Sequence, residues 1–339
     1  AGRHPQRSAI IFGGRVGSRV LDKGITYQEL DDSVNRFAAA MQKLGVKKGD
    51  RVAMFMPNCP QLVIAIYGTM RAGGVAVPCN FLYSAEEIEH QLNDAGAEVV
   101  VTLSTFYERI HSIRTNTQLR HIIVTNIKEY FPPLLRLLFT LAKEKKEGHR
   151  IELASEEDLW FQPLLSASAP APAPVEVGPE DAACLLYTGG TTGVPKGAEL
   201  THRNVVSNAV AGSLWSHSRE AVEITIGALP FFHSYGMTAV MNMTIATACT
   251  MVLIPDPRDV LHIMGSISKR QATFYPAVPT SYVRINTHPQ VHEFDLSSIL
   301  VCLSGAAPLP REVQEQFQAL TGCKLVEAFG MTESLSLIH

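Results

Sequence analysis

The 339-residue sequence lacks an excess of positive charge. Lys and Arg together number 29 against 32 Asp and Glu, which gives a net charge of −3. Without a positive field, the chain has no general means of gathering nucleic acid or other polyanions, so we expect no nucleic-acid partner. Any phosphate that it binds must be held by donors placed locally.

The sequence also lacks paired cysteines and a signal peptide. None of its six cysteines forms a Cys-x-x-Cys pair, and several lie within apolar runs: Cys59, Cys79, Cys184, Cys249, Cys302 and Cys323. This favours buried thiols in a reducing compartment over a disulfide framework or a zinc site. The amino end, AGRHPQRSAIIFGG, has no basic segment followed by an apolar one. We therefore expect a cytoplasmic protein.

An uninterrupted apolar span is missing as well. The longest stretch without Asp, Glu, Lys or Arg runs from Ile224 to Pro255, which is long enough to raise a membrane span. Pro230, His233, Asn242 and repeated threonines interrupt it. A strand, a loop, a helix and a second strand explain the stretch better.

Short apolar strands alternating with helices dominate what the sequence does have. Ser84 and Glu87 show capping-box spacing before one helical segment, and Thr26 and Glu29 show it before another. Strand candidates such as AEVVVTL and ILVCLS are almost wholly apolar. Because strands of this kind are buried on both faces, the pattern predicts an α/β fold with parallel sheets covered by helices.

The composition changes in the middle of the chain. EYFPPLLRLLFTLAKEKKEGHR is an apolar helix candidate followed by a basic segment, and SASAPAPAP is typical of a stiff, extended linker. The predicted division is a first subdomain at 1–165 with a helical insertion near 126–165, a linker at 166–181, and a second subdomain at 182–339.

The insertion carries an apolar stripe of four leucines, with Arg136 and Lys143 nearby: Leu134, Leu135, Leu138 and Leu141. Such a stripe can rest on a membrane surface. Because the segment is short, packing of the helix on its own domain is the favoured alternative.

Residues 187–197 read YTGGTTGVPKG, directly after the apolar run 182–186. Glycines let backbone N–H groups wrap an anion, while threonine hydroxyls and a lysine add donors, so phosphate is the natural occupant. The P-loop pattern fails, because Pro195 precedes Lys196 and Gly197 follows it. No Gly-x-Gly-x-x-Gly opens a helix, which argues against a dinucleotide fold. Taken alone, the segment is equally well explained as a flexible turn.

The longer segment YTGGTTGVPKGAELTH resembles the phosphate-binding loop of the adenylate-forming superfamily, which includes acyl-CoA ligases, peptide-synthetase adenylation domains and luciferases. Three more segments resemble family motifs in the family's order: LPFFHSYGM at 229–237, LSGAAPLP at 303–310 and EAFGMTES at 327–334. The resemblance spans nearly the whole chain. It implies the large amino-terminal domain of that family, with stacked, parallel-rich sheets flanked by helices in αβαβα layers.

The resemblance further implies that a carboxylate attacks the α-phosphorus of ATP and that coenzyme A then displaces AMP. The loop would hold the phosphates through Thr188, Gly189, Gly190, Thr191, Thr192, Gly193 and Lys196. The adenylate would contact Gly305, Ala306, Ala307, Glu327, Ala328, Phe329, Gly330 and Thr332. Glu333, with the Thr188 hydroxyl, would hold Mg²⁺, because hard oxygen ligands suit that ion. The implied catalytic residues are Lys196, His233, Thr332 and Glu333.

Simpler roles compete with three of these assignments. Glu333 by itself is also explained as a solvated glutamate, Phe329 as a core residue, and His233 as an interior histidine. His233 follows Phe232, where amino-acid-activating relatives usually place an aspartate for the substrate ammonium. The histidine at this place, and the lack of any acidic residue from Ile224 to Pro255, favour a fatty acid as the substrate.

The insertion resembles that of bacterial long-chain fatty acyl-CoA synthetases, so a long-chain acid is expected, while medium-chain and aryl acids stay open. The sequence ends at His339. By the resemblance, the ribose-binding aspartate, the hinge and the small carboxy-terminal domain with its lysine are absent. We expect an amino-terminal fragment of the ligase, with a non-catalytic nucleotide or acyl-binding module as the alternative. A homodimer and peripheral membrane contact are open as partners.

Overall fold

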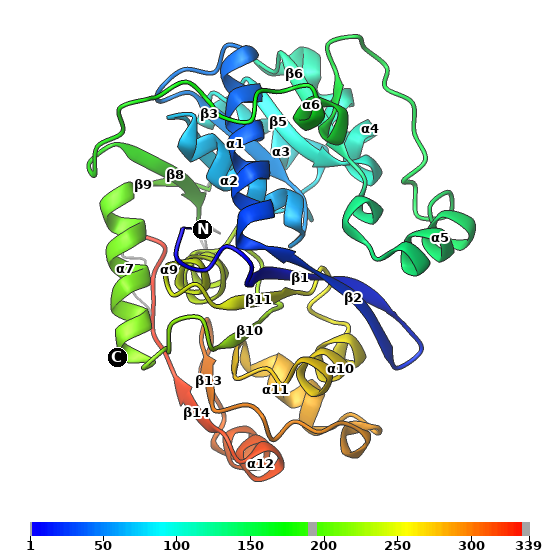
Figure 1. The fold of residues 1–339 in the computed structure, drawn as a ribbon, viewed down its shortest axis with the longest axis vertical. Coiled ribbons are helices and arrows are strands. Elements are labelled where there is room, and N and C mark those ends of the chain that lie inside the picture. Colours follow the sequence, from blue (N-terminus) through cyan, green and yellow to red (C-terminus); the bar gives the residue numbers. More distant parts are fainter. Residues whose placement is uncertain (1, 189–194, 334–339) are drawn as a thin grey trace. The chain divides into compact units, whose positions relative to one another are not determined.

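The computed structural model describes residues 2–188 and 195–333 (Figure 1). The chain forms two compact units. The continuous unit comprises residues 29–203, and the split unit comprises residues 1–28 and 204–339. Each unit has its own sheet and is described by itself.

The continuous unit is built on a seven-stranded sheet with the order β7-β6-β5-β3-β4-β8-β9. All neighbouring strands are parallel except the pair β8–β9. The strands are β3 (Arg51–Phe55), β4 (Val75–Pro78), β5 (Val99–Leu103), β6 (His121–Thr125), β7 (Leu159–Trp160), β8 (Ala182–Tyr187) and β9 (Gly197–Thr201). The helices are α1 (Tyr27–Lys43), α2 (Pro60–Arg71), α3 (Ala85–Ala95), α4 (Tyr107–Ser112), α5 (Pro133–Ala142) and α6 (Phe161–Ser166).

Local sequence signals explain where α3 begins and ends. The Ser84 hydroxyl accepts a hydrogen bond from the Glu87 backbone N–H, and the Glu87 carboxylate accepts one from the Ser84 N–H, so the predicted capping box forms. The helix ends at Gly96, whose φ of 63° is a left-handed conformation that glycine adopts without strain. Ile88 and Leu92 then face a core that includes Phe55, Val100 and Ile122.

The split unit has a second seven-stranded sheet, with the order β14-β13-β12-β10-β11-β1-β2. Only β1 and β2 are antiparallel. The strands are β1 (Ser8–Val16), β2 (Arg19–Thr26), β10 (Ile224–Gly227), β11 (Thr250–Leu253), β12 (Phe274–Ala277), β13 (Val301–Ser304) and β14 (Lys324–Glu327). The helices are α7 (His202–Trp215), α8 (Ser234–Gly236), the π-helix η4 (Met237–Asn242), α9 (Met243–Ala246), α10 (Val260–Arg270), α11 (Pro279–Asn286) and α12 (Arg311–Thr321).

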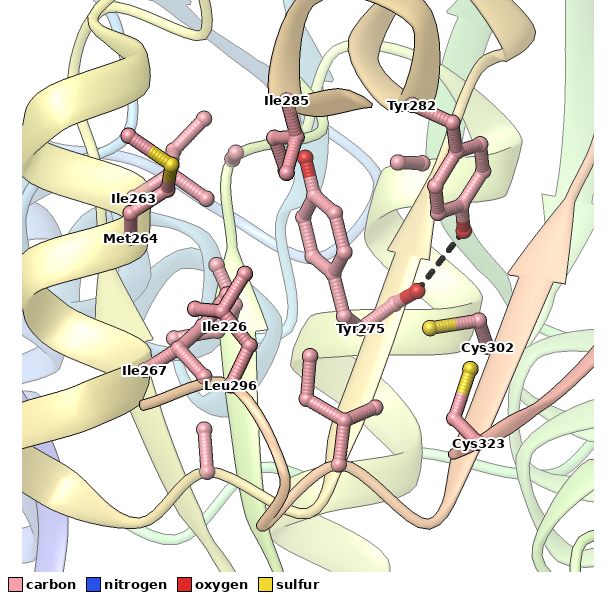
Figure 2. Packing of buried hydrophobic residues seen from close by; sticks show 14 of the residues in the cluster. Ile226, Ile263, Met264, Ile267, Tyr275, Tyr282, Ile285, Leu296, Cys302 and Cys323 are labelled. Atoms are coloured by element: carbon pink, nitrogen blue, oxygen red, sulfur yellow. Dashed lines mark hydrogen bonds between the residues drawn. The ribbon is translucent and has the colours of Figure 1, made fainter. Parts of the chain in front are cut away.

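A core of aliphatic and aromatic side chains packs the helices of the split unit on its sheet (Figure 2). Tyr275 and Tyr282 lie at its centre, and the Tyr282 hydroxyl donates a 2.9 Å hydrogen bond to the Tyr275 carbonyl. Met264 and Ile267 reach this core from α10. Two parallel-rich sheets flanked by helices confirm the predicted α/β class.

The units divide at different places from those expected from composition. Strand β8 pairs with β4 through Ala76 and Cys184, so β8 and β9 belong to the sheet of the continuous unit. The Pro/Ala segment 166–181 also lies within this unit. Gln42 on α1 exchanges two hydrogen bonds with the Ala173 backbone, at 3.0 and 2.8 Å. The segment is therefore held along α1 instead of separating two subdomains.

The charge-free stretch 224–255 forms β10, a loop, the helices α8, η4 and α9, and then β11, as expected. Within the described ranges, no helix is both long and apolar enough to cross a membrane.

Candidate active site

Three of the motif segments meet at one edge of the split-unit sheet. Residues 229–237 follow β10, residues 305–310 follow β13, and residues 328–333 follow β14. These strands are parallel neighbours in the order β14-β13-β12-β10, so their carboxyl ends lie at the same edge. Crevices at this edge are where open α/β sheets bind ligands.

A cavity of about 340 Å³ lies among these segments, within the range typical of small-molecule sites. It is lined by Leu229, Pro230, His233, Ser234, Tyr235, Gly236, Val278, Gly305, Ala306, Ala328, Gly330, Met331 and Thr332. The structure therefore brings together six residues expected at the adenylate or acyl site: His233, Gly305, Ala306, Ala328, Gly330 and Thr332. Ala307, Glu327, Phe329 and Glu333 are not among the lining residues.

Tyr235 lines this cavity and was not singled out from the sequence. Its buried hydroxyl lies 2.5 Å from the Leu303 carbonyl oxygen, to which it donates, and 3.3 Å from that of Ala277. It thereby ties β13 to β12. A Cβ atom at Gly305 would lie 3.0 Å from the Tyr235 ring, which explains a glycine at this position. The one available sequence signal was its place within the motif LPFFHSYGM.

His233 opens onto the cavity from the N-cap of α8. Its ring packs against Phe232, with 4.5 Å between the ring centroids. Neighbouring residues partly desolvate the His233 ring and lower its pKa below its ordinary value although the residue is exposed, and no charged group contributes to the shift. This shift favours the neutral imidazole at pH 7. No carboxylate forms an ion pair with it among the residues that the structure describes.

The loop after β13 presents its backbone to the cavity. Ala306 has a φ of 68°, a left-handed conformation that costs an alanine free energy and is often found at functional sites. The Glu327 carboxylate accepts a 3.2 Å hydrogen bond from the Leu309 N–H. Glu327 thus fixes the end of this loop in the described structure, which is a positioning contact.

Phe329, Thr332 and Glu333 follow β14. The Phe329 side chain is 60% exposed, so the alternative of a core residue is wrong. An exposed aromatic ring beside a cavity suits stacking on a planar base. Glu333 is exposed and Thr332 is half-buried. Their side chains are accessible to a ligand in the split unit.

The glycine-rich loop connects β8 and β9 in the continuous unit. Its ends are closed by a 3.0 Å hydrogen bond from the Thr188 N–H to the Lys196 carbonyl. Lys196 is exposed, and no carboxylate pairs with it among the described residues. Gly189, Gly190, Thr191, Thr192 and Gly193 lie outside the described residues. The described ends of this loop are therefore joined, and Lys196 is an exposed cation beside them.

The whole chain, residues 1–339, matches the family model described as "AMP-binding enzyme". The chain belongs to the AMP-binding enzyme family. The match includes both sheets and all four motif segments, so the cavity and the glycine-rich loop are both parts of an AMP-binding enzyme domain.

Relatives within this family are similar over most of the chain. It is 38% identical to a long-chain-fatty-acid–CoA ligase of Bacillus subtilis, with 100% of this chain and 59% of the relative covered. A structure of ATP-bound MatB from Rhodopseudomonas palustris matches with a TM-score of 0.76 and 27% identity, over 97% of this chain and 57% of that one. An anthranilate CoA ligase in complex with anthranoyl-AMP matches with a TM-score of 0.83 over 98% of this chain and 58% of that one, and at 23% identity it shows the fold alone. The chain thus spans less than two thirds of the length of these proteins.

The donors expected for Mg²⁺ in this AMP-binding domain are few. Among the described residues, no group of three or more His, Cys, Asp or Glu side chains is arranged to hold a metal ion. Mg²⁺ usually binds through one or two protein oxygens together with substrate phosphates and water. Glu333 and Thr188 offer one carboxylate and one hydroxyl, in separate units. The donor chemistry fits an ion that arrives with ATP.

Proposed function

We propose that the protein carrying this chain is an AMP-forming ligase that converts a fatty acid, with ATP and coenzyme A, into an acyl-CoA. The observation that carries the proposal is the cavity shared by the segments after β10, β13 and β14, in a chain of the AMP-binding enzyme family. The name of the Bacillus subtilis relative supports a long-chain acid.

The proposed first step is the attack of the carboxylate oxygen on the α-phosphorus of ATP, with pyrophosphate leaving. Positioning and charge neutralisation dominate such a step, because little acid–base chemistry is needed at phosphorus. Lys196 is assigned to the departing pyrophosphate, as an exposed cation at the end of the glycine-rich loop. Thr332 is assigned to the α-phosphate from the wall of the cavity.

In the second step, the sulfur of coenzyme A attacks the acyl carbonyl carbon and AMP leaves. We assign His233 to this path because it lines the cavity and its lowered pKa favours the neutral ring. In a neutral ring one nitrogen can accept a hydrogen bond. Glu333 is assigned to Mg²⁺, which would neutralise phosphate charge when bound.

The nucleotide base is assigned to Gly305, Ala306 and Ala307, with Phe329 stacked on it. The left-handed Ala306 and the exposed Phe329 support this assignment. Glu327, Ala328 and Gly330 complete the set as the neighbouring residues on and after β14. A cytoplasmic location also belongs to the proposal, and we assign no surface to a homodimer.

The decisive experiment is acid-dependent ATP–pyrophosphate exchange by the full-length protein, across fatty acids of increasing length, aryl acids and amino acids. Affinity should rise roughly threefold to fourfold for each added methylene, which corresponds to ~0.8 kcal/mol, until the apolar binding site is filled. Amino acids should give no exchange, because no described cavity residue offers a carboxylate to their ammonium group. A maximum at acetate or at benzoate-like acids would reject a long-chain substrate, and robust exchange with amino acids would reject the fatty-acid assignment.

A further inference from the structure

Helix α5 presents four leucine side chains to solvent. Leu134, Leu137, Leu138 and Leu141 are between 40% and 77% exposed. At 3.6 residues per turn they fill a continuous arc of about 100° around the helix. Leu135 and Phe139 lie on a different side and are buried. We call the four exposed residues the leucine face; its members differ from the predicted stripe, because Leu135 points into the protein.

Packing on the other side holds the leucine face outward. The Phe139 ring contacts the rings of Phe131 and His149, with centroid distances of 5.6 and 5.3 Å. The Asn126 side chain donates a 3.2 Å hydrogen bond to the His149 carbonyl, which closes the segment around α5. In Figure 1, α5 lies at the outer edge of the continuous unit. The leucine face is therefore a fixed surface of a packed helix.

The segment that contains this face is rich in cations although the chain as a whole is acidic. Residues 126–150 contain six Lys and Arg against three Glu, a net charge of +3, whereas the chain carries −3. Glu144 pairs with Lys128, and Glu147 with Lys143. The ion pairs among the described residues include none of the four remaining cations, Arg136, Lys145, Lys146 and Arg150.

We propose that the leucine face docks on the surface of an anionic lipid bilayer. An apolar face of leucines, with Arg136 on the other side of the helix and Lys145, Lys146 and Arg150 in the segment after it, matches the composition of helices that lie in a membrane interface. The ten-residue length of α5 suits a helix lying in the surface plane, because a spanning helix needs about 20 residues. Each cation near an anionic surface contributes about 1 kcal/mol, or about fivefold in binding. A protein partner is less favoured, because interface centres are enriched in aromatic residues and depleted of lysine.

The test is co-sedimentation of the full-length protein with vesicles of phosphatidylcholine alone, or with part of it replaced by phosphatidylglycerol, without ATP or fatty acid. The result is therefore independent of the proposed enzymatic function. Replacing Leu137 and Leu141 together by Glu should weaken binding to the anionic vesicles by about tenfold or more. The matched control replaces Leu82 and Leu214 by Glu, two leucines of similar exposure outside α5. The control should bind as the unmodified protein does.

A second variant separates charge from apolar contact. Lys145→Gln with Lys146→Gln should weaken binding to anionic vesicles by about fivefold per cation, less so at high salt, and leave binding to phosphatidylcholine unchanged. The same two substitutions at Lys23 and Lys324 should have no effect.

Direct insertion can be followed from Leu141→Cys carrying an environment-sensitive fluorophore, because all six natural cysteines are buried. Its emission should shift to shorter wavelength on anionic vesicles, whereas that of labelled Leu82→Cys should not. The proposal is overturned if the unmodified protein does not sediment with anionic vesicles, or if the Leu82 and Leu214 control loses as much binding. It is also overturned if the leucine variant changes the oligomeric state in ultracentrifugation and leaves vesicle binding intact, because a second copy would then be the occupant.

Discussion

Tyr235 packs its ring against Gly305 so closely that a Cβ atom at residue 305 would lie 3.0 Å from the ring. The Tyr235 hydroxyl at the same time holds the Leu303 carbonyl at 2.5 Å. The Tyr235 side chain therefore contacts both the loop after β13, through Gly305, and the strands β13 and β12, through the carbonyl groups of Leu303 and Ala277.

Gly305→Ala should displace this loop by a few tenths of an ångström, because ring and Cβ cannot both keep their places. We expect ATP affinity to fall about tenfold and the free energy of unfolding to fall by roughly 1–3 kcal/mol. Isothermal titration with ATP and urea unfolding measure the two effects. Tyr235→Phe is the control: it keeps the ring but loses the hydroxyl, so it should cost about 1 kcal/mol of stability and little ATP affinity. Equal losses of affinity in both variants would contradict the steric explanation.

Lys196→Ala should slow ATP–pyrophosphate exchange by about thirtyfold, since a lost charge-assisted donor costs on the order of 2 kcal/mol. Exchange is measured at saturating acid in the full-length protein. Lys324→Ala, at the start of β14, removes an exposed lysine far along the strand from the cavity edge and should leave the rate unchanged. An unaltered rate in Lys196→Ala would remove this lysine from the reaction.

Glu333→Gln should raise the Mg²⁺ concentration needed for half-maximal exchange, because the amide oxygen preserves size but loses the negative charge that attracts the ion. A Mg²⁺ titration of the exchange rate tests this. Glu312→Gln on α12 is a matched substitution of an exposed glutamate and should leave the titration curve in place. Superimposable curves for the Glu333 variant and the unmodified protein would exclude Glu333 from the metal site.

His262 on α10 should make stability depend on acidity. Burial lowers its pKa from 6.5 to about 4, an effect that the nearby Asp259 only partly offsets. As the pH falls below 6.5, His262 becomes protonated in the unfolded chain but stays neutral in the folded protein. Stability is therefore fully present above pH 6.5 and is lost progressively down to about pH 4. The loss amounts to at most roughly 3 kcal/mol.

Urea unfolding at pH 7 and pH 5 measures this dependence. His262→Gln should be less stable at both pH values and should show a smaller decrease in stability between them, because residue 262 no longer titrates. Some decrease should remain, because other histidines of lowered pKa, such as His149, are unchanged. The same decrease in both proteins would show that His262 does not titrate in this window.

Much of the architecture could be predicted because it rests on local signals. The capping box of Ser84 and Glu87 and the apolar strands at 99–103 and 301–304 act within a few residues, so the α/β class followed from reading along the chain. The four motif segments likewise allowed the family to be predicted, because the residues of each motif are continuous in the sequence.

Contacts between distant residues were decided only by the tertiary structure. The pairing of β8 with β4 places β8 in the sheet of the continuous unit, and the pairing of Ile10 with Met251 places β1 in the sheet of the split unit. The helical period predicted an apolar stripe of leucines on α5. Which leucines face inward depends on the positions of Phe131 and His149, against which Phe139 packs. Tyr235 beneath Gly305 joins residues that are 70 positions apart in the sequence. The sequence by itself therefore determined the elements, the motifs and the family, because these depend on neighbours along the chain. Burial, strand order and the shape of the cavity depend on neighbours in space, and only the folded chain decides which residues those are.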